Sequence, residues 1–245
     1  MDNTPTLASY LLYLGDTALV TGHRNSEWCG HGPVLEQDIA ITNISLDLIG
    51  QARNFYQYAG EMLGTDEDKL AYLRDPAGFR NIVMAELPKG DWAFTILRQF
   101  FTSTFQHLLY AELVSSPDAR LAAIAAKSIK EVLYHKRWSS EWVIRLGDGT
   151  DESHRRISEA LKELWPYSTE FFRPAPYESG VAPDPSRYRD KWMEETTAVF
   201  AEATLDVPAP SGIIFSGKTG IHSDHLDELL HEMQVLPRTY PDATW

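Results

Sequence analysis

The segment over residues 33–63 has apolar residues on almost every side when it is read at helical spacing. These residues are Ile39, Ile41, Ile44, Leu46, Leu48, Ile49, Ala52 and Phe55. A helix that is apolar on every side is usually buried on every side. Its polar residues recur at steps of four, four and three and therefore share one face: Asn43, Asp47, Gln51 and Asn54. A polar stripe on a buried helix must be satisfied by a metal, by a network of side chains or by a partner chain.

The rest of the chain repeats the helical period in several segments and nowhere alternates long enough to give a confident strand. We predict about seven helices, over residues 6–24, 33–63, 92–114, 121–146, 157–172, 188–205 and 224–236, together with a short one over 67–73. Four long helices precede residue 147, and a longer crossover joins the middle two. This is the outline of a ferritin-like four-helix bundle. The predicted fold class is all-α, a single ferritin-like domain over 1–245 with the core bundle over about 6–147 and additional helices over about 152–236.

Prolines, glycines and capping residues place the boundaries of these helices. We expect Pro166 to bend one helix, Ser223 to cap the last helix and Pro237 to stop it. Residues 79–86 are apolar but too short for periodicity to distinguish helix from strand. Residues 206–220 are rich in Pro, Gly and Ser and are expected to form a long loop or lid.

Composition narrows the class of protein. A formal charge of −13, spread along 245 residues, argues against binding to nucleic acid or to an anionic membrane surface. The negative charge is still compatible with a basic protein partner. Cys29 is the only cysteine, which excludes an intramolecular disulfide framework. The N-terminus lacks a basic n-region, and no apolar run approaches the roughly 20 residues of a membrane span. We therefore expect a soluble cytoplasmic protein.

Ferritin-like oxygenases hold two irons with one Glu from each of two helices and a Glu-x-x-His motif from each of the other two. The second long helix offers Asp47, but Gly50 stands three residues on, where a histidine is required. The fourth offers His135, with Val132 three residues before it and Glu131 on its flank. Two ligands on different helices cannot hold a di-iron centre.

The other two long helices add little to this set. The first has a single acid in its middle, Asp16, and the third has Gln106 and His107 at the matching level. We therefore predict no metal ligands, and we interpret Asp47 and His135 as vestigial ligand-like positions. They are expected to pair with each other, or with Gln51 and His107.

Three other candidates lie outside this set. Glu228 and His231 form a literal Glu-x-x-His on the last helix, which we interpret as exposed surface because no second copy accompanies it. His222 and His225 flank a helix start, where local capping is favoured over metal binding. Cys29 stands near His31, but a lone cysteine is more often a small buried hydrophobe than a nucleophile. No catalytic and no cofactor-binding residue is predicted.

Three long stretches resemble a known family: EWCGHGPVLEQDIAITNISLDLIGQARNF, AAKSIKEVLYHKRWSSEWVIRLGDGT and GIHSDHLDELLHEMQVLPRTYPDATW. They are similar to the PaaC-type subunits of phenylacetyl-CoA 1,2-epoxidases, and the likeness covers almost the whole chain. The resemblance implies a ferritin-like fold in a bacterial multicomponent monooxygenase of phenylacetate degradation. It also implies a non-catalytic structural subunit that stabilises a homologous catalytic subunit.

The resemblance also implies the partners and their cofactors. They are a catalytic di-iron subunit of the same fold (PaaA type), a small subunit (PaaB type) and a reductase (PaaE type) with FAD and an iron–sulfur cluster that draws electrons from NADPH. The helix over 92–110 and surface tryptophans are candidate contact elements. Self-association of the chain without its partner is left open. The alternatives are a di-iron oxygenase in its own right, a docking module for the reductase, and a free-standing binding module for CoA esters or another protein.

Overall fold

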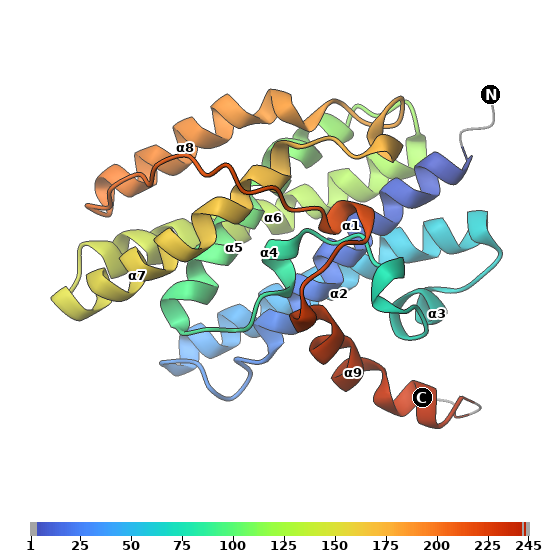
Figure 1. The fold of residues 1–245 in the computed structure, drawn as a ribbon, viewed down its shortest axis with the longest axis horizontal. Helices are drawn as coiled ribbons and strands as arrows, with labels where there is room; N and C mark the ends of the chain where they lie inside the picture. The colour runs from blue at the N-terminus through green and yellow to red at the C-terminus, as the bar shows by residue number, and fades with distance from the viewer. Residues whose placement is uncertain (1–3, 242, 244–245) are drawn as a thin grey trace.

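The computed structural model describes residues 4–241 and 243, and the described residues form nine α-helices with short 3₁₀ turns between them (Figure 1). Four long helices make the bundle: α1 (Thr4–Ser26), α2 (Leu35–Leu63), α5 (Trp92–Leu113) and α6 (Ala119–Gly147). Helices α1 and α2 pack along their length, as do α5 and α6. Among the described residues the only bridge of β type joins Ser216 to Ile221. The prediction of an all-α, ferritin-like bundle is confirmed.

Capping residues begin the second pair of bundle helices. The Asp91 carboxylate accepts a hydrogen bond from the backbone N–H of Phe94 at 2.9 Å, which starts α5 after Pro88 and Gly90. The Asp118 carboxylate accepts from the N–H of Leu121 and also from the Tyr58 hydroxyl at 2.6 Å. The second of these bonds fixes the start of α6 against the C-terminal half of α2.

The other helices cover two sides of the bundle (Figure 1). Helices α7 (Asp151–Leu164) and α8 (Arg189–Glu202) pack on α5 and α6. Helix α9 (Asp224–Thr239) packs on α3 (Glu67–Tyr72) and on α4 (Val83–Glu86), which lies at α1. An extended strap over residues 206–216 runs between α8 and α9, with no helix of its own.

Four local predictions about helix boundaries, helix type and capping are wrong. Helix α7 begins at Asp151 and not at 157, because Thr150 and Ser153 form a capping box. Residues 165–172 form a 3₁₀ helix and not a bent α-helix. Pro237 lies inside α9, which runs to Thr239. The Ser223 side chain makes no capping hydrogen bond.

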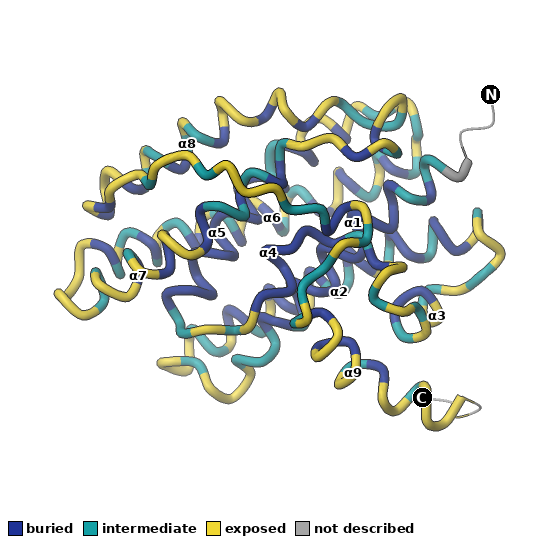
Figure 2. Tube along the Cα trace, viewed as in Figure 1, coloured by how far each residue is buried: buried dark blue, intermediate teal, exposed yellow. Residues whose placement is uncertain are grey.

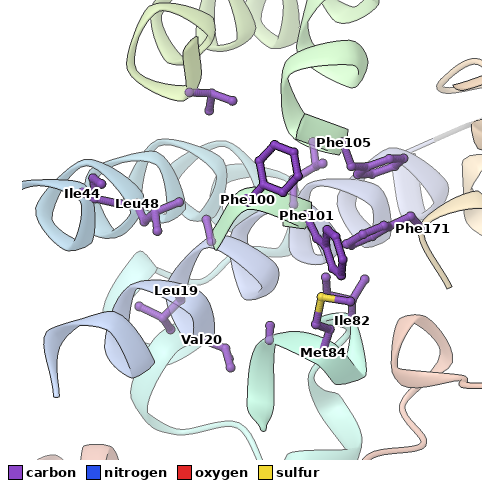
Figure 3. Packing of buried hydrophobic residues seen from close by; sticks show 14 of the residues in the cluster. Leu19, Val20, Ile44, Leu48, Ile82, Met84, Phe100, Phe101, Phe105 and Phe171 are labelled. Atoms are coloured by element: carbon purple, nitrogen blue, oxygen red, sulfur yellow. The ribbon is translucent and has the colours of Figure 1, made fainter. Parts of the chain in front are cut away.

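The core fills the space between the long helices with large aromatic side chains (Figure 3). The rings of Phe105 and Phe171 stack with centroids 4.9 Å apart, and Trp192 packs against Phe101 at 5.3 Å. Helix α5 runs through the middle, and its residues 93–106 are buried (Figure 2). Within the described residues, every helix is too short or too polar to cross a membrane.

Helix α2 departs from its predicted burial on all sides. Its residues Ile41, Ile44, Leu48 and Phe55 are fully buried in the core. Its opposite face is bare, however, with Leu35, Ile39 and Leu46 exposed by 71%, 52% and 62%. This chain alone therefore covers only one side of a helix whose sequence is apolar on both.

Candidate functional site

The polar stripe of α2 meets α6 through two side-chain contacts. The Nε2 atom of His135 lies 3.0 Å from Oδ2 of Asp47, and because a carboxylate only accepts, that nitrogen carries the proton. The Gln51 amide donates to Oε2 of Glu131 at 2.9 Å, one helical turn away along both helices. The interpretation of Asp47 and His135 as a pair is confirmed.

The two members of this pair are not equally buried. His135 is fully buried, whereas 37% of the Asp47 side chain is exposed. A carboxylate that keeps contact with water loses little solvation on folding, so this pair costs less than one in the interior. The Asp47–His135 pair therefore joins α2 to α6 at the edge of the core and not at its centre.

Gly50 and Val132, the two positions where expected metal ligands are missing, lie in different surroundings. A Cβ atom built on Gly50 would meet no atom within 4 Å, so this position faces open space and not the core. The interpretation of Gly50 as a lost histidine is wrong in geometry, although its spacing suggested it. Val132 is fully buried in the bundle and does occupy an inward position with an apolar side chain.

Asp16, the acid of α1, is committed to other partners. Its carboxylate accepts from the Tyr56 hydroxyl at 2.5 Å, from both terminal nitrogens of Arg74 and from the backbone N–H of Arg80 at 2.7 Å. Burial, with the charge of Asp16, raises the pKa of Tyr56 well above its usual value, so the phenol stays protonated. The network ties α1 to α2 and to the segment after α3.

On α5, Gln106 is buried and its Oε1 atom has no hydrogen-bond partner among the described residues, while His107 is half-buried beside Lys136. Burial lowers the pKa of His107, and the charge of Lys136 acts in the same direction.

Across the part of the chain that the structure describes, no three acidic, histidine or cysteine side chains converge as metal ligands do. One carboxylate, one imidazole and an apolar Val132 do not fit a di-iron centre, which needs four carboxylates and two histidines.

The segment between α3 and α5 carries a buried acid that sequence reasoning missed. Glu86 is fully buried and binds the loop before α9: its carboxylate lies 2.8 Å from Nδ1 of His222 and accepts from the N–H of Ser223 at 2.6 Å. Nε2 of His222 faces the carbonyl of Phe79 at 3.0 Å. The capping interpretation of His222 is wrong. An acid within an otherwise apolar run was the signal that could have found this contact.

A buried ion pair between Lys218 and Glu178 lies directly after the strap. Lys218 donates to Glu178 at 2.8 Å and to the carbonyl of Arg173, and its aliphatic stem and amine are almost fully buried. Burial lowers the pKa of the Lys218 amine, while the charge of Glu178 opposes that effect. Glu170 accepts from the backbone N–H groups of Val83 and Lys218, and burial raises the pKa of this acid. These contacts hold the C-terminal third of the chain on the bundle.

The remaining candidates are the predicted contact helix α5, Cys29 with His31, and the Glu-x-x-His motif of α9. Trp92 packs edge-on against three tryptophans within this chain, and residues 93–106 of α5 are buried, so this part of the helix has no surface free for another subunit. Residues 107–108 are partly exposed and residues 111–112 are exposed, so a subunit contact at this end of α5 stays a prediction. Cys29 is exposed, and the interpretation of it as a buried hydrophobe is wrong. The ring of His31 approaches the backbone carbonyl of Cys29 and not its thiol. Glu228 and His231 are exposed on α9, as predicted.

Comparison with known proteins adds two findings. The family model described as "Phenylacetic acid catabolic protein" matches residues 1–245. A protein of Escherichia coli (strain K12), named as the C subunit of 1,2-phenylacetyl-CoA epoxidase, is 46% identical over 245 residues, which cover 98% of this chain and 99% of that protein.

Proposed function

Because this chain belongs to the phenylacetic acid catabolic protein family, we propose that it is the structural, PaaC-type subunit of a cytoplasmic multicomponent phenylacetyl-CoA 1,2-epoxidase. In this role it stabilises a homologous di-iron catalytic subunit and performs no chemistry itself. The small subunit and the NADPH-dependent flavin and iron–sulfur reductase complete the assembly.

The observation that carries the proposal is the donor set inside the bundle. A ferritin-like core is present, but its ligand positions hold Val132, a partly exposed Asp47 paired with His135, and an Asp16 already bound by Arg74. A subunit that keeps the fold without the ligands fits a role in shape and assembly. The name of the E. coli relative, as one subunit among several, supports the same role.

Physical chemistry gives this role a plain mechanism. A protein that binds only the folded form of its partner raises the partner's stability by mass action. A di-iron subunit must keep carboxylates in its interior, which costs stability before metal is bound. A sister subunit free of metal ligands supplies apolar surface that offsets this cost.

The test is to produce the catalytic subunit with and without this chain and to compare its soluble yield, melting temperature, iron content and phenylacetyl-CoA turnover. We expect all four to be higher for the pair, with the other components added in both cases. A catalytic subunit that is equally soluble, metal-loaded and active alone would refute the structural role. If the two subunits bind but only reductase coupling fails without this chain, its role is docking of the reductase.

A further inference from the structure

The outer face of α2 carries three large apolar side chains that this chain leaves uncovered, with the polar residues Thr42 and Asn43 between Ile39 and Leu46. At 100° per residue, Leu35, Ile39, Leu46 and Gly50 fall on one stripe, and the three large side chains are each more than half exposed. The same helix buries Ile41, Ile44 and Leu48 on its other side. Singly exposed apolar residues are normal at a surface, but an aligned series on one long helix marks an interaction site.

Helix α6 extends this face on one side. The contact between Asp47 and His135 joins the two helices, and the residues that precede them, Leu46 and Tyr134, are both exposed. Gly50 follows Leu46 by one turn, and no atom lies within 4 Å of where its Cβ would be. The missing side chain leaves room for the backbone of another helix to approach closely.

The charge around this surface differs from that of the rest of the chain. Helix α6 has six Lys and Arg residues and two Glu residues, whereas the whole chain carries a net −13. Lys127 and Lys130 are exposed and form no ion pair with any described residue. The nearby carboxylates of Asp47 and Glu131 already accept hydrogen bonds from this chain. The surface therefore fits a partner with an apolar ridge and acidic side chains at its edge.

We propose that the α2–α6 face, formed by Leu35, Ile39, Leu46, Gly50, Tyr134, Lys127 and Lys130, is the surface that docks the catalytic subunit of the same fold. This inference rests on the proposed function for the identity of the partner. A second copy of this chain fits less well. In a two-fold contact the patch meets itself, and the carboxylates it could offer to Lys127 and Lys130 are few: Glu36 is exposed, whereas Asp47 and Glu131 already accept hydrogen bonds within the chain.

The experiment co-expresses a tagged catalytic subunit with this chain and measures the amount that co-purifies and the dissociation constant of the pair. The test variant is Ile39→Glu/Leu46→Glu, and the matched control is Val235→Glu, which replaces a similarly exposed apolar residue on α9. Far-UV circular dichroism and melting temperature of each purified chain show that it is folded. We expect the double variant to bind at least about a hundredfold more weakly, and the control to bind within about threefold of the unmodified chain.

A second variant, Lys127→Glu/Lys130→Glu, tests the charge. We expect it to weaken binding more at low than at high salt, because exposed charges are screened. If all variants bind as the unmodified chain does, the face is wrong although the proposed function stands. If the unmodified chain does not bind the catalytic subunit, the proposed function itself fails, and this inference with it. If the only effect of Ile39→Glu/Leu46→Glu is to dissociate a homodimer of this chain, with binding to the catalytic subunit unchanged, the partner is a second copy and the inference is overturned.

Discussion

His222 holds the loop before α9 through two contacts that both require a proton on the ring. Its Nδ1 atom faces the carboxylate of Glu86 at 2.8 Å and its Nε2 atom faces the carbonyl of Phe79 at 3.0 Å. Both neighbours are acceptors, so the ring satisfies them only as the imidazolium. Burial by itself lowers the pKa of His222, but the hydrogen bond and charge of Glu86, aided by the charge of Asp16, outweigh it and raise the pKa above 6.5.

The substitution His222→Phe removes both contacts. A hydrogen bond to a charged group contributes about 1.5–3 kcal/mol. Glu86 keeps its bonds from the N–H of Ser223 and the amide of Asn81, so its carboxylate is not left bare. We therefore expect a loss of about 2–4 kcal/mol in the free energy of unfolding at pH 6. For a chain of this length, a loss of about 3 kcal/mol lowers the melting temperature by about 6–12 °C.

The effect should depend on pH with a definite sign. Because the pKa of His222 is higher in the folded than in the unfolded chain, its stabilisation is fully present below about pH 6.5. It is lost as the pH rises through the folded-state pKa. The difference between the unmodified chain and His222→Phe should therefore narrow from pH 6 to pH 9. The difference between the unmodified chain and His222→Gln, which keeps one N–H donor, should be smaller and should narrow over the same pH range, because glutamine does not titrate.

The assay is urea unfolding followed by far-UV circular dichroism at pH 6, 7.5 and 9. The matched control is His231→Phe, which replaces an exposed histidine on α9 and should change the free energy of unfolding by less than about 0.5 kcal/mol. A difference for His222→Phe that is below about 0.5 kcal/mol, or equal at all three pH values, would refute the assignment of a buried imidazolium.

Three further outcomes follow from the buried groups. Asp47→Ala should lower stability by about 1–3 kcal/mol, because it leaves the buried Nε2–H of His135 unpaired; loss of epoxidase turnover in a stable, fully assembled complex would contradict a purely structural role. Glu178→Gln should lower the free energy of unfolding, measured by thermal unfolding, by about 3–5 kcal/mol, because it leaves the buried amine of Lys218 without its charged partner. Lys218→Met in that background should recover part of the loss, and no recovery would count against charge pairing as the cause. The purified chain, incubated with ferrous iron and desalted, should hold well under one iron per chain by elemental analysis, and about two per chain would overturn the prediction that this chain has no di-iron site.

Part of the fold was readable from the sequence because it depends on local periodicity. The apolar stripes at helical spacing gave the four long helices, and Asp91 and Gly64 lie at helix boundaries as their residue types indicate. The pairing of Asp47 with His135 followed from two inward polar positions without further ligands. Local signals of this kind need no knowledge of the tertiary neighbours.

Contacts over long sequence distances were decided only by the tertiary structure. Nothing in the local sequence links Glu86 to His222, 136 residues away, or Glu178 to Lys218, since a charge is buried only where the fold brings its partner. Likewise, periodicity could not show that Gly50 faces open space, because spacing of three residues fits an inward and a flanking position alike. The sequence determined that α2 is apolar on almost every side; the packing of α1 and α6 decided which side remains bare, because a helix buries whichever face its neighbours reach.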